Sequence, residues 1–371
     1  MYTPNSHERL SRVFEPLNVQ GLVIPNRIAL APINTGFATL EGMVTQRLVD
    51  FHQKIAGGKV GLSIVGSTAV SSEGLVNFNG LRLYDDKFAS GISALFEAIE
   101  KEGSVPAIQL MHSGRQTTRQ VTGMAPVAPT MLESANGEAL EELSREGIKR
   151  IVSDFATASR RAKEAGAKLI EVHAAHGYLI TQFLSAYSNN RTDEYGGSLQ
   201  NRSRFLEEVI LAIRREVNLP LSVRLSVIEF VPGGLELVES CRIAKRLEQL
   251  GVAMISVSAG NYVYSSERIY PTTEREMFER AQWSAAVKSG LTIPVIGGGR
   301  VADLLDAERF LTEGKMDMVA MGRPLIADPN LVAKTKRGEW SAIEFCNWTN
   351  YCRYPSPVVN SCLRCEVNRN L

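Results

Sequence analysis

Short apolar runs alternate with amphipathic helical patterns along most of the chain. The runs are apolar on both faces, which is typical of strands in a parallel sheet that is covered by helices. Eight such runs predict strands at residues 27–32, 60–70, 105–112, 168–175, 220–227, 253–260, 294–299 and 316–323. A helix-like pattern follows each run, for example at residues 144–165, 199–217, 235–251 and 301–314.

Eight strand-then-helix units in a row predict an α/β fold, a (β/α)8 TIM barrel that fills roughly residues 25–338. The competing fold is a doubly wound open sheet. That fold has a glycine-rich phosphate turn after its first strand, and no such turn follows residues 27–32. We therefore expect a barrel domain over residues 1–340 and a short cysteine-containing C-terminal extension over residues 341–371.

Two connections are long for a barrel, residues 113–143 and 176–198. Long strand-to-helix loops lie on the catalytic face of a barrel, where they shape the pocket. We expect residues 113–143, together with residues 261–270, to determine which substrate is accepted. Tyr262 and Tyr264 are candidate pocket walls, although tyrosines in loops often pack only at a surface.

The charge balance excludes some classes of function. The chain has 41 basic and 40 acidic residues and no basic block, so a nucleic-acid or membrane-surface role has little support. The N-terminal stretch lacks the apolar core of a signal peptide, and no apolar run reaches the eighteen or so residues of a membrane span. We expect a cytoplasmic protein that acts on a small molecule.

Four of the five cysteines lie close together near the C-terminus, at Cys346, Cys352, Cys362 and Cys365. Disulfides are disfavoured in the cytoplasm, so a cluster of thiols there indicates metal ligands or redox chemistry.

The last two predicted strands end in residues that suit a phosphate. Glycines let backbone N–H groups approach phosphate oxygens, and arginine adds charge-assisted hydrogen bonds. Each end alone would also fit a tight turn and a surface charge, but together, at the two strand ends where barrels often hold phosphate, they favour a phosphate site. The residues are Gly297, Gly298, Gly299 and Arg300 after the seventh strand, and Gly322, Arg323 and Pro324 after the eighth.

Polar residues also occur within other predicted strands. Gln109 lies in the third strand and Arg224 in the fifth. An arginine in an otherwise apolar parallel strand is costly unless it faces an anion. Arg224 is therefore a candidate for stabilising negative charge on a cofactor ring.

Two of the five histidines, His173 and His176, close the fourth strand, and Tyr178 follows them. Such a pair can bind a metal ion, but metal sites usually recruit a third ligand and none is evident here. The other interpretation is a pair of N–H donors that bind one substrate oxygen. Tyr178 is then a candidate proton donor, because the reference pKa of tyrosine keeps it protonated at neutral pH.

The segment from His173 to Ile210, HAAHGYLITQFLSAYSNNRTDEYGGSLQNRSRFLEEVI, resembles the Old Yellow Enzyme family of FMN-dependent barrel oxidoreductases. The similar stretches are spread in order over almost the whole chain, which makes the resemblance specific. They are PNRIALAPI (25–33), AIQLMHSGRQ (107–116), VRLS (223–226), GGGR (297–300) and MGRPLIADP (321–329).

The resemblance implies FMN on the catalytic face, NADH or NADPH as the electron donor, and an activated alkene as the substrate. His173 and His176 would bind the carbonyl or nitro oxygen of the alkene, FMN would give a hydride to its β-carbon, and Tyr178 would protonate its α-carbon. The residues implied to hold FMN are Pro32 and Ile33 beside the ring, Gln109 and Arg224 at its polar edge, and Gly299, Arg300, Gly322 and Arg323 at the phosphate. Asn34 departs from the Thr or Cys that is common in the family, which leaves the tuning of the flavin open.

The C-terminal cysteines resemble the iron–sulfur motif of 2,4-dienoyl-CoA reductase, enoate reductase and trimethylamine dehydrogenase. Thr349 replaces the expected second cysteine and the spacing is one residue short, but Cys362 could supply the fourth thiolate. Four thiols suit a [4Fe–4S] cluster or Zn²⁺, and a tail without ligands is the third alternative.

The sequence ends at Leu371, whereas the large relatives continue with FAD- and nucleotide-binding domains. A cluster would then need a separate electron-transfer subunit, unless NAD(P)H binds directly over FMN. The main alternative function is an oxidative amine demethylase or dehydrogenase, and a non-catalytic flavin-holding subunit is a third. We also expect a homo-oligomer.

Overall fold

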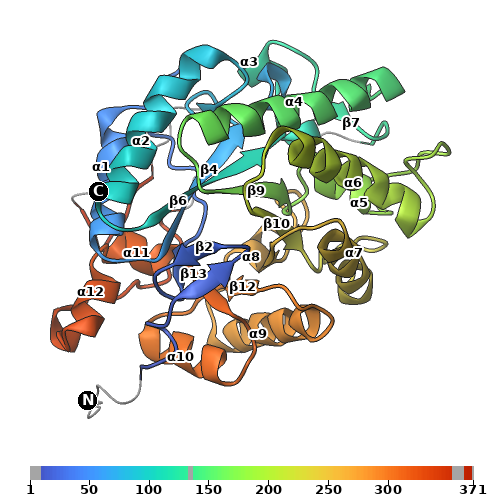
Figure 1. Cartoon of the computed structure of the whole chain (residues 1–371). Helices are drawn as coiled ribbons and strands as arrows, with labels where there is room; N and C mark the ends of the chain where they lie inside the picture. Colours follow the sequence, from blue (N-terminus) through green and yellow to red (C-terminus); the bar gives the residue numbers. More distant parts are fainter. Residues whose placement is uncertain (1–9, 133–136, 353–362, 370–371) are drawn as a thin grey trace.

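A computed structural model describes residues 10–132, 137–352 and 363–369. Eight parallel strands form its centre and helices surround them (Figure 1). The hydrogen-bonded order is β3-β13-β12-β11-β10-β9-β6-β4, and β3 also pairs with β4, which closes the sheet into a barrel. The predicted (β/α)8 barrel is therefore confirmed, and the open-sheet alternative is wrong. The barrel strands are β3 (Ile28–Leu30), β4 (Leu62–Ala69), β6 (Val105–Met111), β9 (Leu169–Ala174), β10 (Leu221–Ser226), β11 (Met254–Ser258), β12 (Val295–Gly298) and β13 (Met318–Met321).

Each predicted strand contains one barrel strand, and the strands of the structure are shorter at their ends. The outer helices form where amphipathic patterns follow a capping side chain. The Ser144 hydroxyl accepts the Gly147 N–H at the start of α4, and Thr273 forms a reciprocal capping box with Glu276 at the start of α9. The main helices are α1 (Gln46–Gly57), α2 (Ala89–Lys101), α4 (Arg145–Glu164), α6 (Leu199–Glu216), α7 (Leu237–Gln249), α9 (Glu274–Ser289) and α10 (Leu304–Thr312).

Short elements fill the loops that follow the strands. Residues 113–143 contain α3 (Arg119–Thr122), β7 (Val127–Ala128) and β8 (Glu141–Glu142), whereas residues 176–198 contain α5 (Leu179–Leu184). The others are β5 (Leu81–Arg82), α8 (Ser266–Ile269), α11 (Arg323–Ala327) and α12 (Leu331–Lys336). Among the described helices, none combines the length and the apolar character that crossing a bilayer requires.

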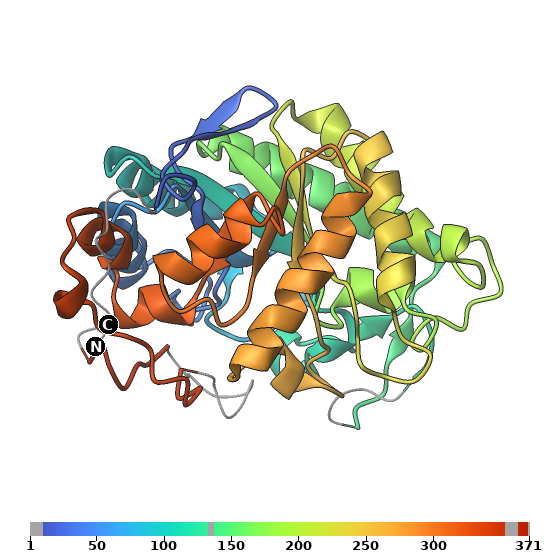
Figure 2. The same cartoon turned by 90° about the horizontal axis from the view of Figure 1, so that it is seen from below.

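A β-hairpin closes the N-terminal end of the barrel. Its strands are β1 (Leu17–Val19) and β2 (Leu22–Ile24), which pair antiparallel. Leu17, Val19 and Ile24 are buried in one apolar cluster with inward-facing residues of the barrel strands. In the side view the hairpin lies at one end of the barrel and the C-terminal segment lies toward the other (Figure 2). Because the hairpin blocks one end, access to the interior is confined to the C-terminal ends of the strands.

Removal of the Ile24 side chain tests this plug. Ile24 is fully buried, so Ile24→Ala leaves a cavity and should lower the free energy of unfolding by about 2–5 kcal/mol in urea titrations. The neighbouring Val23 is 59% exposed, so Val23→Ala should change the unfolding free energy by less than about 0.5 kcal/mol. Equal effects of the two substitutions would show that the hairpin does not plug the barrel.

Candidate functional site

A cavity of about 600 Å³ lies at the C-terminal ends of the barrel strands. This volume is within the range of pockets that enclose a cofactor or a small ligand. Most of the residues predicted for the site lie in its wall. They are Pro32, Ile33, Asn34, His176, Tyr178, Arg224, Gly299, Arg300, Gly322 and Arg323. Gln109 and His173 are not in the wall, but both are buried beside it and contact residues of the site.

The two histidines lie side by side, with ring centroids 5.1 Å apart. His176 has a left-handed backbone conformation (φ 62°), and its backbone N–H donates to Ser226 Oγ. Its side-chain Nε2 lies 2.7 Å from Ser258 Oγ. The Nδ1 atom of His173 has no partner among the described residues. Burial lowers the pKa of both imidazole rings well below the usual value. For His173, the charge of Arg224 is the second cause. Both imidazoles are therefore neutral at physiological pH and can each donate one N–H.

The histidine pair has no third metal ligand beside it in the described part of the chain. Across the described ranges, no three His, Cys, Asp or Glu side chains come together as a metal-binding group. Ser258, which fixes one nitrogen of His176, was not predicted for the site, because a serine in an apolar strand has no distinctive pattern.

Tyr178 lies against both the histidine pair and the loop after β11. Its ring centroid is 5.0 Å from that of His173 and 5.6 Å from that of Tyr262. Burial, and then the proximity of Tyr262, raises the pKa of Tyr178 well above its usual value, so its hydroxyl stays protonated. Tyr262 lines the cavity as predicted, and its hydroxyl is 2.8 Å from that of Tyr270. Tyr264 is 41% exposed and lies outside the cavity wall, so it serves as surface packing.

The floor of the site carries an ionic group that the sequence interpretation missed. Glu171 is fully buried in β9, two residues before His173. Its two carboxylate oxygens accept hydrogen bonds from Gln109 Nε2 at 2.8 Å and from Ser222 Oγ at 3.1 Å. Arg224 is half-buried, and its Nε has no partner among the described residues. The sequence signal for Glu171 is an acidic residue within an apolar strand, which is as unusual as the arginine at position 224.

Three arginines meet at the other end of the cavity. Arg300 Nε donates to the Thr272 carbonyl at 2.7 Å, and Arg323 Nη2 donates to the Pro271 carbonyl at 2.7 Å. The third, Arg280, comes from α9, and the sequence interpretation missed it because one buried arginine in an otherwise charged helix leaves no signal. Its guanidinium donates to the Arg268 carbonyl, and no acidic side chain is bonded to it within the described segments.

Arg280 is a buried cation without a bonded anion in the described part of the structure. Only 5% of the residue is exposed. Burial, followed by repulsion from Arg224, Arg268 and Arg323, lowers the pKa of Arg280 to about 9. Gly299 has a positive φ of 107°, and a Cβ at this position would collide with the Arg280 side chain. This end of the cavity is therefore a cationic cradle with open backbone, which suits a phosphate.

The C-terminal segment covers the cationic end of the cavity. The Trp348 ring lies 5.0 Å from the Arg300 guanidinium and 4.7 Å from that of Arg323, which are cation–π contacts. Asn350 Oδ1 accepts a 2.6 Å hydrogen bond from Arg323 Nη1. Leu363 lines the cavity, and its N–H donates to the Thr35 carbonyl at 2.8 Å.

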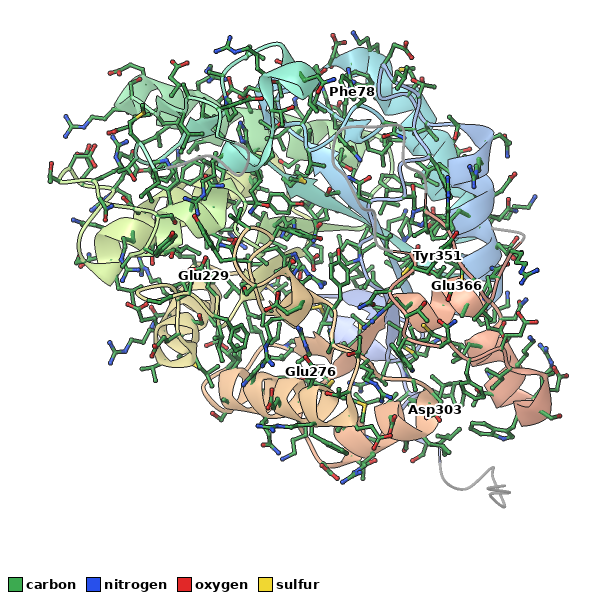
Figure 3. All side chains as sticks on the ribbon, turned by 180° about the vertical axis from the view of Figure 1, so that it is seen from behind. Phe78, Glu229, Glu276, Asp303, Tyr351 and Glu366 are labelled. Carbon is green, nitrogen blue, oxygen red and sulfur yellow. The ribbon has the colours of Figure 1, made fainter. Side chains whose placement is uncertain are left out.

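The segment also has bonds within itself. Glu366 Oε2 accepts from both Asn347 and Thr349 at 2.8 Å, on the side where Glu366 and Tyr351 are labelled in Figure 3. Thr349, which takes the place of the expected second cysteine, therefore serves as a hydrogen-bond donor in this segment.

Three of the four predicted thiols lie within the described residues. Cys346, Cys352 and Cys365 are half-buried, and Cys352 lines the cavity. Burial raises the pKa of Cys346 and Cys352, and a thiolate at Cys365 would raise both further. Cys362 lies outside the described residues, so the four-cysteine metal site of the C-terminal segment stays a prediction.

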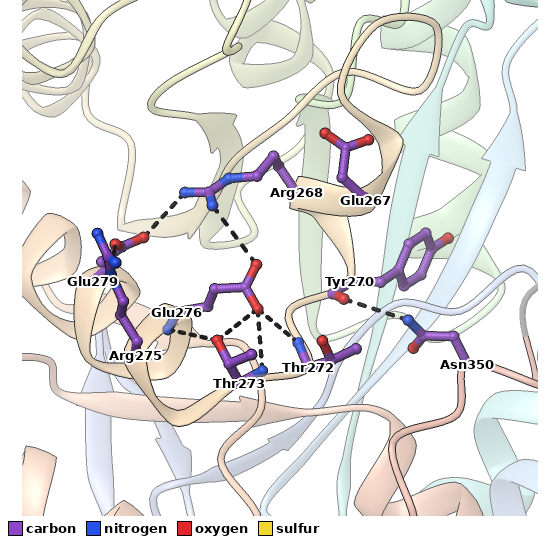
Figure 4. Close-up of a pocket in the computed structure, with 9 residues that line it drawn as sticks. All are labelled: Glu267, Arg268, Tyr270, Thr272, Thr273, Arg275, Glu276, Glu279 and Asn350. Carbon is purple, nitrogen blue, oxygen red and sulfur yellow. Dashed lines mark hydrogen bonds and ion pairs between the residues drawn. The ribbon is translucent and has the colours of Figure 1, made fainter.

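A second, more open pocket lies between α8, α9 and Asn350 (Figure 4). Arg268 pairs with Glu279 at 3.0 Å and with Glu276 at 3.7 Å, and Arg275 pairs with Glu279 at 3.2 Å. Both arginines of this pocket are thus paired with carboxylates, whereas Arg280, Arg300 and Arg323 of the 600 Å³ cavity form no ion pair within the described residues. The 600 Å³ cavity is therefore the better site for an anionic ligand.

The site and the barrel define a class of protein, a flavin-dependent oxidoreductase. The sequence profile of the NADH:flavin oxidoreductase / NADH oxidase family matches residues 12–340. The chain belongs to this family, which includes the Old Yellow Enzymes. Its cofactor is accordingly FMN.

Individual relatives agree with this assignment. An NADH oxidase of Thermoanaerobacter brockii is 40% identical over 96% of this chain and 56% of its own length. An NADPH dehydrogenase of Bacillus subtilis is 34% identical over 86% of this chain and 92% of its own length. The structure of a 2-naphthoyl-CoA reductase complex superposes with a TM-score of 0.89 at 28% identity, over 96% of this chain and 57% of that one. The chain thus spans about half the length of the first curated relatives that it matches, at 56% and 50%.

The cavity fits FMN at both ends. Within the described residues, the Arg224 Nε and the His173 Nδ1 lack partners where the ring would lie, and Arg280 has no bonded anion where the phosphate would lie. Arg224 and Gln109 would hold the polar edge of the ring, and Arg300, Arg323 and Arg280 would hold the phosphate. Pro32 and Ile33 line the cavity and would lie beside the ring.

Replacement of Arg280 tests the cationic cradle. Arg280→Gln removes a buried charge that faces the phosphate, so the Kd of the apoprotein for FMN should rise roughly tenfold to a hundredfold. The Kd is measured by the quenching of FMN fluorescence. Arg275→Gln is the matched control, because this side chain lies on the same helix and is 88% exposed. An unchanged Kd in Arg280→Gln would exclude Arg280 from the cradle.

Proposed function

We propose that the chain reduces the C=C bond of α,β-unsaturated carbonyl or nitro compounds. The observation that carries the proposal is a group of three side chains beside the cavity: two neutral imidazoles and one tyrosine that stays protonated. The His173 ring contacts the rings of both His176 and Tyr178. The partner of this site is accordingly a small activated alkene.

The histidines act on the oxygen of the substrate. Two N–H donors aimed at a carbonyl or nitro oxygen draw electron density toward it and make the β-carbon electrophilic. Because both rings are neutral, they hold the oxygen without transferring a proton. The chemistry that bound FMN supplies is the transfer of a hydride from NAD(P)H to the β-carbon.

Tyr178 completes the reaction on the other carbon. Hydride addition leaves negative charge on the α-carbon and the oxygen, and the Tyr178 O–H donates its proton to the α-carbon. The raised pKa of Tyr178 keeps this proton in place until that charge develops. The surrounding cavity wall, which includes Ile33, Val257 and Ile269, excludes water from the reacting atoms.

An oxidative amine reaction fits the site less well. An amine substrate has no oxygen to accept two N–H donors, and the neutral pair His173 and His176 would then have no partner. The absence of an acidic side chain among the described residues of the cavity wall also leaves an amine cation without a counter-charge.

Anaerobic stopped-flow measurements with wild-type protein and Tyr178→Phe test the proposal. NADH or NADPH should reduce the flavin equally well in both proteins. Cyclohexenone or a nitroalkene should then reoxidise the wild-type flavin, and Tyr178→Phe should slow this step with cyclohexenone by roughly a hundredfold or more. Reduction by NAD(P)H without reoxidation by any activated alkene would overturn the proposed reaction.

The double substitution His173→Ala with His176→Ala tests the oxygen-binding pair. Loss of two hydrogen bonds should weaken the binding of an enone to the oxidised protein by roughly tenfold or more, as seen in the flavin absorbance, while FMN stays bound. In the wild-type protein, enone binding should not change between about pH 8 and pH 6. The reason is that the pKa of both rings is lowered, so the rings become protonated, and lose their neutral state, only at a lower pH. Release of FMN by the double variant would instead make the pair structural.

A further inference from the structure

Glu171 lies in the layer of side chains directly below the cavity. It pairs in register with Gln109 on β6 and with Ser222 on β10, and His173, two residues later, pairs with Arg224. Side chains two residues apart on a strand point to the same face, so Glu171 and His173 both point into the barrel. The carboxylate is therefore located between the two residues that are assigned to the polar edge of the flavin, Gln109 and Arg224.

The contacts of Glu171 fix the orientation of the Gln109 amide. Gln109 Nε2 donates to Glu171 Oε1 at 2.8 Å, so the amide nitrogen points down into the barrel. The amide oxygen consequently points away from Glu171. Gln109 Oε1 lies beside Gly66. A Cβ added to Gly66 would be 3.3 Å from Gln109 Oε1 and 2.8 Å from Pro32 Cβ. Pro32 and the amide oxygen of Gln109 thus both lie near Gly66, and Pro32 is a wall residue of the cavity.

Glu171 also balances the charge of Arg224. Both carboxyl oxygens accept hydrogen bonds, which favours the ionised form. Burial raises the pKa of Glu171, and the attraction of Arg224 opposes this rise. Burial in turn lowers the pKa of Arg224, and the attraction of Glu171 opposes this decrease. Two charges buried in one place are tolerated because each is the counter-ion of the other.

We infer that Glu171 is a positioning residue for the flavin: it sets the direction of the Gln109 amide and offsets the charge of Arg224, and it thereby holds down the reduction potential of FMN. The inference rests on the assignment of Gln109 and Arg224 to the flavin ring and not on the identity of the alkene. A cation beside the ring favours the reduced flavin, which is the more negative form, and the anion of Glu171 weakens that effect.

The substitution Glu171→Gln tests this role with little change of shape. It removes the anion and leaves the charge of Arg224 unopposed, so the midpoint potential of bound FMN should shift in the positive direction in a spectroscopic redox titration. The new amide can also donate to Gln109 Oε1, which would allow the Gln109 amide to turn over. The Kd of the apoprotein for FMN is measured as well, so that a change in FMN binding is separated from a change in the midpoint potential.

A smaller perturbation guards against loss of the fold. Ser222→Ala removes the hydroxyl that donates to Glu171 Oε2, which makes the ionised carboxyl less stable. The potential should again shift in the positive direction, by less than in Glu171→Gln. Glu308→Gln is the matched control, because Glu308 is a buried glutamate that accepts the backbone N–H groups of Arg12 and Val13 and does not line the cavity.

The outcomes decide between a positioning role and a structural one. A positive shift in Glu171→Gln and Ser222→Ala, with the wild-type potential in Glu308→Gln, supports the inference. An unchanged potential in Glu171→Gln with FMN bound overturns it. If Glu171→Gln does not hold FMN, an unchanged potential in Ser222→Ala also overturns it. None of these measurements includes an alkene, so a failure of the proposed reaction would leave their result unaffected.

Discussion

The parallel pairing of β3 with β4 is the interaction on which the site depends. These two strands are the first and second of the barrel in sequence, and their hydrogen bonds convert an open sheet into a closed one. Closure brings the C-terminal ends of all the strands to one rim, so that His176 after β9 and Arg323 after β13 line the same cavity. The hairpin at the other end leaves that rim as the entrance. Residues far apart in the sequence thus become neighbours through backbone pairing alone.

A second constraint is the cost of burying positive charge. Arg224 is half-buried and Arg280 is buried, and their electrostatic surroundings differ. Arg224 has the carboxylate of Glu171 as a permanent counter-ion, whereas Arg280 is bonded to a backbone carbonyl and repelled by its neighbours. The protein therefore supplies its own anion below the flavin ring and leaves the anion at the far end to be supplied by a ligand. This asymmetry favours a dianionic phosphate at only one end of the cavity.

Much of this arrangement could be predicted from the sequence. The eight strands are visible because runs that are apolar on both faces are typical of a covered parallel sheet, and the GGGR and MGRP stretches mark two strand ends. Glu171 could have been found by the argument that singled out Arg224. Arg280 and Ser258 could not, because their roles depend on contacts between α9 or β11 and distant segments, and their local sequence patterns are those of an ordinary helix and strand. The position of the C-terminal segment over the cavity was equally invisible in the sequence.

The contact between Trp348 and the two arginines makes the C-terminal segment part of the binding equilibrium. Arg300 and Arg323 each face Trp348 on one side and the cavity on the other. A ligand that holds these guanidinium groups in place also positions them for contact with the indole ring. The indole ring, in turn, holds the same guanidinium groups in place for the ligand. By thermodynamic linkage, FMN stabilises the docked segment by the same free energy with which the docked segment stabilises FMN. Docking of the C-terminal segment and occupancy of the cofactor site are therefore thermodynamically coupled.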